Sequence, residues 1–197
     1  MAREDNVARF ESIVQEIRRP GIEKLMEFIR KSDFYTAPAS TRFHGSYEGG
    51  LLEHSLNVYD NLVAKKQSPK WKEILEKIPE ESFKVIALFH DLCKTYYYGS
   101  ELRNKKDENG KWIQVPFYTV EDKIPYGHGE KSVMMLQRYI GLTQEEIYAI
   151  RWHMGPYECD GSYQTLGTAM EMYPVILATF EADMEATYIT EKQEDKQ

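Results

Sequence analysis

The stretch VIALFHDLCK, Val85–Lys94, decides how this chain folds. Its continuous apolar run predicts a buried helix over about 81–93, because only an element covered on all sides is apolar all round. The same stretch carries three ionisable groups: His90, Asp91 and Lys94. A carboxylate that is removed from water without a partner costs several kcal/mol, so a compensating charge must lie beside Asp91.

The same pattern recurs along the chain. Predicted helices place further ionisable groups on apolar faces or at a helix start: His54, His128, His153 and Asp183. Each of them alone is typical of a hydrogen-bonded core residue or a surface ion pair. Taken together, they predict that several helices converge on one divalent cation, since imidazole and carboxylate are suitable ligands for Mn, Fe, Co, Ni or Zn.

The periodicity predicts a mainly α fold with one small β-hairpin. We expect the hairpin over 95–122, because two β-prone runs there flank the polar turn NKKDENGK. The Thr143 and Glu146 spacing predicts a capping box that begins a helix. The helices are expected over about 2–18, 22–32, from Gly50 onward, 70–78, 81–93, 127–140, from Thr143 to Gly155, and 170–190.

The hairpin is rich in aromatic residues, and two interpretations are open. The aromatic rings either stack with a nucleobase or form cross-strand pairs that hold the hairpin against the helices. We favour the second interpretation. The residues concerned are Tyr96, Tyr97, Tyr98, Trp112, Phe117 and Tyr118.

Composition limits the classes of protein to which this chain can belong. The chain has 197 residues, of which 42% are hydrophobic, which suits one domain with a sizeable core. A net charge of −7 argues against wrapping of long duplex nucleic acid. The N-terminal residues do not resemble a secretory signal and the apolar runs are too short to cross a bilayer, so we expect a cytoplasmic protein with no membrane contact. With only two cysteines in the sequence, we expect both to be free thiols. The sequence leaves the oligomeric state open.

The ordered segments GGLLEHSLNV, LFHDLCK, GHGEKS, IRWHMG and EADMEA resemble the HD-domain superfamily of metal-dependent phosphohydrolases. The segment TRFHGSYEGGLLEH, with its histidine ahead of Gly49 and Gly50, is also similar to members related to bacterial 3′–5′ exoribonucleases. The resemblance implies an all-α HD bundle. We expect a single HD domain, 1–197, which consists of N-terminal helices (1–39), a metal-binding HD core (40–187) and a charged tail (188–197).

The resemblance also implies a ligand set. It makes the core metal site from His54, His90, Asp91 and Asp183. His128 and His153, with Asp91 as the bridge, resemble the additional ligands of members that hold two ions. One or two divalent ions are therefore expected as cofactor.

The chemistry expected from the resemblance is hydrolysis of a phosphoester or phosphodiester by metal-activated water. Asp91 is expected to assist as a base, Lys94 to bind a phosphate oxygen, and Arg42 and His44 to contact a second oxygen or protonate the leaving group. The expected substrate is a nucleotide or a short oligonucleotide. Two alternatives stay open: a di-iron oxygenase of the same superfamily, similar to inositol oxygenase, and a catalytically silent nucleotide-binding module.

Overall fold

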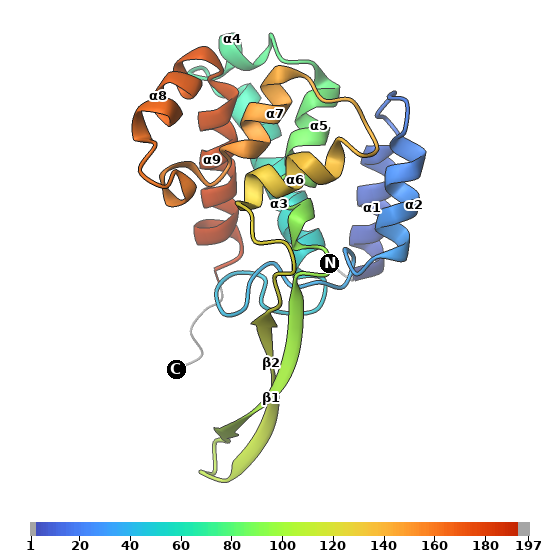
Figure 1. The fold of residues 1–197 in the computed structure, drawn as a ribbon, viewed down its shortest axis with the longest axis vertical. Coiled ribbons are helices and arrows are strands. Elements are labelled where there is room, and N and C mark those ends of the chain that lie inside the picture. Colours follow the sequence, from blue (N-terminus) through green and yellow to red (C-terminus); the bar gives the residue numbers. More distant parts are fainter. Residues whose placement is uncertain (1–2, 193–197) are drawn as a thin grey trace.

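Helix α3, Gly50–Gln67, is the longest helix and packs against helices from both halves of the chain. The computed structural model describes residues 3–192. Figure 1 shows α1 and α2 on one side of the helical bundle, α8 on the opposite side, and a hairpin that extends away from the helices. The mainly α fold class with one small hairpin is confirmed.

Most elements follow one another with short connections, but a long loop, 32–49, joins α2 to α3. The first half contains α1 (Arg3–Val14), α2 (Ile22–Lys31), α3 (Gly50–Gln67), α4 (Lys72–Leu75), α5 (Glu80–Phe89) and the 3₁₀ turn η1 (Leu92–Lys94). The second half contains β1 (Tyr98–Lys106), β2 (Trp112–Val120), α6 (His128–Leu136), α7 (Gln144–Arg151), η2 (Gly155–Glu158), α8 (Tyr163–Met172), α9 (Val175–Glu185) and the π turn η3 (Ala186–Thr190). Within these residues, no helix is both long and apolar enough to span a membrane.

Helix α5 lies at the centre of the core. Every residue from 82 to 89 is buried, as its continuous apolar sequence predicts. The Phe89 ring packs edge-on against Phe10 of α1 at 5.8 Å between centroids, and Phe10 contacts Phe34 at 5.3 Å. These contacts fix the end of α5, and with it His90, relative to the N-terminal helices.

The predicted helix over 81–93 is too long. Helix α5 ends at Phe89, and Asp91 has φ −103° and ψ 21°, outside the helical range. The chain then forms η1, in which the Lys94 N–H bonds to the Asp91 carbonyl and the Lys94 ammonium lies 2.6 Å from the Asp91 carboxylate. The His-Asp pair therefore lies at the carboxyl end of a buried helix.

The single helix predicted over 170–190 is also wrong. Tyr173 has φ −133° and ψ 83°, outside the helical range, since a proline disfavours helical geometry in the residue that precedes it. The break separates α8, which was not predicted, from α9. The capping box at Thr143 and Glu146 is confirmed, with both of its reciprocal hydrogen bonds present.

Strands β1 and β2 pair antiparallel, with Ser100 opposite Tyr118 near the base and Lys106 opposite Trp112 near the tip. The favoured interpretation of the hairpin aromatics is wrong for the outer part of the hairpin. Trp112 is 64% exposed, and Phe117 packs under the Arg103 guanidinium instead of against another ring. At the base, the Tyr98 hydroxyl donates to the Ala39 carbonyl at 2.9 Å and joins the hairpin to the bundle.

Candidate metal centre

The start of α3 places two histidines side by side. Gly49 has a φ of +88°, and a Cβ on Gly50 would lie 2.0 Å from the Gly45 carbonyl oxygen, so the two chain segments meet only without side chains. This contact brings the loop that carries His44 against the first turn of α3. The His44 and His54 rings lie 4.9 Å apart between centroids.

Three buried histidines turn the same ring nitrogen toward one point. His90 Nδ1 donates to the Ala87 carbonyl at 2.9 Å, and His153 Nδ1 donates to the Ile150 carbonyl at 2.7 Å. These bonds leave Nε2 of each ring as the free acceptor. His54 Nε2 lies 3.3 Å from His90 Nε2, so ring nitrogens from α3 and from the end of α5 face each other.

Two buried carboxylates complete the cluster. Asp91 lies 3.4 Å from His90 Nε2 and 3.5 Å from His153 Nε2, and Asp183 lies 3.1 Å from His54 Nε2. Asp91 Oδ1 and His153 Nε2 have no hydrogen-bond partner among the described residues. Buried polar atoms of this kind are rare unless a ligand satisfies them.

The donor set fits a divalent cation. Within residues 3–192, three overlapping groups place one ligand atom per residue within 4.8 Å of the others: His44, His54 and Glu191; His54, His90 and Asp91; His90, His153 and Asp183. Carbonyl and carboxylate acceptors hold the second nitrogen of three of these rings, as is usual for metal-bound imidazole. Nitrogen and carboxylate ligands are suitable for Mn, Fe, Co, Ni or Zn, so the donor set does not identify the metal.

The electrostatics of the cluster favour a bound positive charge. Burial lowers the pKa of His54, but hydrogen bonds to Asp183 and Glu191 outweigh this effect and raise the pKa to about 10. Burial also opposes ionisation of Asp183, yet the hydrogen bond from His54 dominates and lowers its pKa to about 2. The carboxylates thus hold a proton on His54 at the position that a cation would take.

Glu191 was not predicted as part of the site. The sequence places it in the predicted charged tail, but its side chain is only 3% exposed and accepts from His54 Nδ1 at 3.0 Å and from Asn57 at 2.9 Å. A run such as EKQEDKQ is typical of solvated chain, so the sequence contains no signal for this contact. The predicted tail, 188–197, begins inside η3, and its residues 193–197 lie outside the described residues.

The residues predicted to act on the substrate line one cavity of about 530 Å³. Lys94 and Asp91 lie on its wall, and Arg42 is exposed at its edge. Burial, together with the nearby His54, lowers the pKa of His44 to about 4, so its imidazole is uncharged at neutral pH. The residues that the cavity shares with the predictions are Arg42, His44, Asp91, Lys94 and Asp183.

His128 lies beside the cluster and belongs to none of its three groups. Its Nε2 is 3.7 Å from the Glu158 carboxylate, and its Nδ1 is 3.6 Å from the Cys93 sulfur. The predicted additional ligands are therefore separated: His153 is in the cluster, while His128 pairs with Glu158 at its edge.

Comparison with known proteins gives one match. A family model described as HD domain matches residues 51–183, which extends from the start of α3 to the last aspartate of the cluster. No curated protein and no solved structure matches the chain.

Proposed function

The chain belongs to the HD-domain family, whose members are in general metal-dependent hydrolases, and we propose that it cleaves a phosphoester or phosphodiester bond of a nucleotide or short oligonucleotide. The observation that carries the proposal is the convergence of His54, His90 and His153 with two carboxylates beside a cavity that also presents Lys94. Without the Lys94 ammonium, which can bind phosphate, the same ligand set would support metal binding only.

His54, His90, His153, Asp91 and Asp183 hold the ion in this proposal. When bound, the ion supplies Lewis-acid chemistry, in which it lowers the pKa of a water molecule and polarises a phosphoryl oxygen. Asp91 or Asp183 accepts the proton that the attacking water loses. Both carboxylates are ionised at neutral pH because neighbouring histidines and Lys94 outweigh the effect of burial on their pKa.

Lys94 binds a non-bridging phosphate oxygen and orients Asp91. Its ammonium lies 2.6 Å from Asp91 Oδ2, which leaves two N–H donors for the substrate. Arg42 at the cavity edge supplies a second, charged contact to phosphate. Because the His44 imidazole is uncharged at neutral pH, we propose that it donates an N–H hydrogen bond to the substrate.

Exposed aromatic rings at the cavity support a nucleotide as substrate. Phe43, Tyr157 and Tyr188 line the cavity and are 75%, 68% and 64% exposed. Aromatic rings beside a phosphate-binding pocket stack on nucleobases with little preference for sequence. A cavity of about 530 Å³ accommodates a ligand of nucleotide size.

The test is an assay of purified protein with Mn²⁺, Ni²⁺ or Co²⁺ against bis(p-nitrophenyl) phosphate, nucleoside phosphates and short oligonucleotides. We expect hydrolysis that H90A abolishes. Hydrolysis by H90A at the wild-type rate would contradict the proposal. Lys105→Gln, on the exposed hairpin, is the control.

The same preparation separates the two alternative functions. Elemental analysis that finds iron, together with dioxygen consumption, would support the oxygenase. Tight nucleotide binding by calorimetry with no product formed would support the silent binding module. Either result contradicts hydrolysis.

A further inference from the structure

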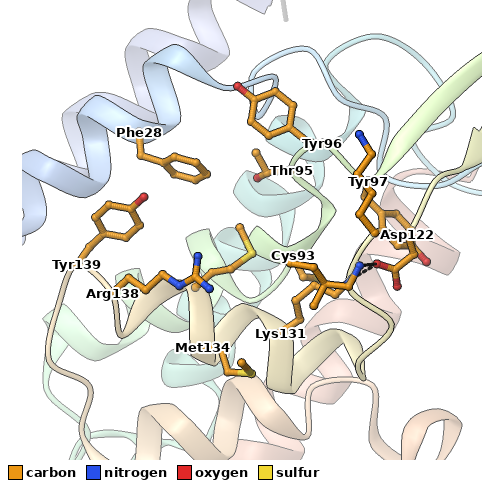
Figure 2. Close-up of a pocket in the computed structure, with 13 residues that line it drawn as sticks. Phe28, Cys93, Thr95, Tyr96, Tyr97, Asp122, Lys131, Met134, Arg138 and Tyr139 are labelled. Atoms are coloured by element: carbon orange, nitrogen blue, oxygen red, sulfur yellow. Dashed lines mark hydrogen bonds and ion pairs between the residues drawn. The ribbon is translucent and has the colours of Figure 1, made fainter.

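A second cavity lies on the other face of the segment that carries the metal ligand Asp91. Asp91 and Lys94 line the cavity of the metal centre, whereas Cys93, Thr95 and the residues after it line this second cavity of about 250 Å³. Figure 2 shows side chains from α2, η1 and α6 and from the chain that leads to and from the hairpin around it. Nothing in the proposed hydrolysis uses this cavity.

The walls are flat and largely apolar. Phe28 and Tyr139 stack on each other, with 5.4 Å between centroids and 24° between planes. Met134, Met135 and Tyr97 supply further apolar surface. A cavity of about 150 Å³ is sufficient for a benzene ring, so this one holds a single ring with one or two substituents.

Two cations of the cavity wall have no carboxylate partner among the residues that the structure describes. Arg138 and Lys123 form no ion pair with any of residues 3–192, whereas Lys131 is paired with Asp122 at 2.5 Å. In Figure 2 the guanidinium of Arg138 lies on the same side of the cavity as Phe28 and Tyr139. The cavity therefore carries an excess of positive charge next to apolar rings, which favours an anion.

A buried hydroxyl points to the same conclusion. Thr95 is 7% exposed and lines the cavity, and its Oγ1 has no hydrogen-bond partner within the described part of the chain. An unpaired buried hydroxyl costs about 1–3 kcal/mol, a cost that a polar group of a ligand would remove. Thr95 and Arg138 are thus two independent polar groups at one apolar cavity.

We propose that this cavity is a second ligand site, which binds a small planar organic acid of one aromatic ring and one carboxylate. The ring packs against Phe28, Tyr139 and the methionines. Arg138 binds the carboxylate, and Thr95 hydrogen-bonds to the ligand. The site does not depend on hydrolysis at the metal centre.

The test uses metal-free full-length protein with 4-hydroxybenzoate as probe, followed by isothermal titration and saturation-transfer NMR. Two control ligands are compared with the probe. 4-Hydroxybenzamide keeps the ring but lacks the negative charge, and acetate keeps the charge but lacks the ring. We expect saturable binding of the carboxylate, with much weaker binding of both controls. The proposal would be overturned if the amide bound as tightly as 4-hydroxybenzoate. It would also be overturned if 4-hydroxybenzoate gave no saturation-transfer signal at millimolar concentration.

Variants locate the binding. R138Q removes an exposed charge and is expected to raise the Kd about tenfold. T95V keeps the shape of Thr95 without its hydroxyl and is expected to raise the Kd several-fold. R103Q, on the hairpin, changes the net charge equally and leaves the Kd unchanged. If R42Q weakens binding and R138Q does not, the probe occupies the metal-centre cavity and the proposal is wrong.

Discussion

The close approach of Gly45 and Gly50 shows how single residues set the geometry of the centre. No side chain fits between these backbones, and their contact places His44 against His54. Glu191 has a comparable effect from the opposite end of the chain, because it holds His54 Nδ1 and so directs Nε2 toward Asp183. Small changes at such positions are expected to alter the chemistry more than the fold.

Glu191→Gln is expected to lower the affinity for Mn²⁺ by about 10–100-fold, since a glutamine holds the His54 ring but does not increase its basicity as a carboxylate does. Calorimetric titration of the metal measures this effect. Glu185→Gln is the matched control, because Glu185 pairs with Lys65 outside the cluster. An unchanged affinity in the Glu191 variant would mean that its contact with His54 is only structural.

Lys94→Met is expected to lower kcat/KM of hydrolysis by about 10²-fold, because the charge that stabilises the phosphoryl transition state is lost. Steady-state kinetics with a phosphodiester substrate measure it. Bound Mn²⁺ per chain should stay near the wild-type value, since Lys94 is not a ligand in the proposal. A loss of metal without a loss of activity per bound ion would assign Lys94 to the metal site instead.

The predicted ligands could be found from sequence because their type conflicts with their surroundings. His90 and His153 follow apolar residues on helices, and only a specific partner explains imidazole there. Glu191 shows no such conflict, because charged neighbours surround it along the chain. Its burial arises from a π turn whose path is determined by packing, which local sequence does not encode.

At the scale of elements, helix α7 is joined to its neighbours by one buried carboxylate. Glu146 closes the capping box, accepts two hydrogen bonds from Arg19 at 2.7 Å each and one from Ser82 of α5. Arg19 also bonds to Glu81. This network fixes α7 against α5 and the α1–α2 connection, and α7 in turn leads directly to His153.

Glu146→Gln is expected to destabilise the fold by about 3 kcal/mol, because Arg19 is left partly buried without a full charge partner. Chemical denaturation followed by circular dichroism measures it. Glu145→Gln lies in the same turn without such contacts and should change stability by less than about 0.5 kcal/mol. Equal effects of the two variants would contradict a role for the network.

The same variant is expected to change the pH dependence of stability. Burial raises the pKa of Glu146, but hydrogen bonds from Arg19 and Ser82 outweigh it and lower the pKa below the ordinary value of 4.5. The stabilisation is therefore complete above the unfolded-state pKa and is lost as the pH falls through the folded-state pKa. Glu146→Gln should lose less stability on acidification than wild type.

Sequence periodicity predicted the existence of most elements but not all of their ends. The capping box has a local chemical basis, so the start of α7 was predictable. The end of α5 depends on the tertiary contacts of His90, Asp91 and Lys94, which the periodicity does not contain. Helix α8 has a weak pattern interrupted by Gly167, and it is stabilised by packing on α9.

At the scale of the whole molecule, the hairpin and the bundle contribute unequally to stability. Figure 1 shows β1 and β2 extending away from the helices, and nearly all residues of β1 are exposed. An isolated two-stranded hairpin is marginally stable in water. The free energy of folding therefore resides in the bundle.

Replacement of residues 101–117 by Asn-Gly should change the free energy of unfolding by less than about 1 kcal/mol, because Ser100 and Tyr118 already face each other across the base and suit a two-residue turn. Urea denaturation measures it. Phe89→Ala, in the core, should cost about 3–5 kcal/mol and shows that the assay is sensitive. A large loss on shortening would place the hairpin within the folding unit.

Metal binding should stabilise the whole bundle, because the cluster joins α3, the end of α5, the end of α7 and α9. At a Mn²⁺ concentration of 100 times the Kd, the gain is about 2.7 kcal/mol. Differential scanning calorimetry should show a rise in Tm for wild type and none for H90A. A rise of equal size in H90A would indicate that Mn²⁺ stabilises the protein from a different site.

The distribution of the cluster along the chain also affects the order of assembly during synthesis. Its side chains range from His44 to Glu191, and the two carboxylates opposite His54 belong to the last part of the described chain. Ribosomes release the N-terminal helices first. A nascent polypeptide that has exposed only α1–α5 offers histidines without Asp183 or Glu191, so ion capture waits until α9 and Glu191 have been synthesised. The geometry of the folded site, its ligand types and the metals available to it then select which ion is bound.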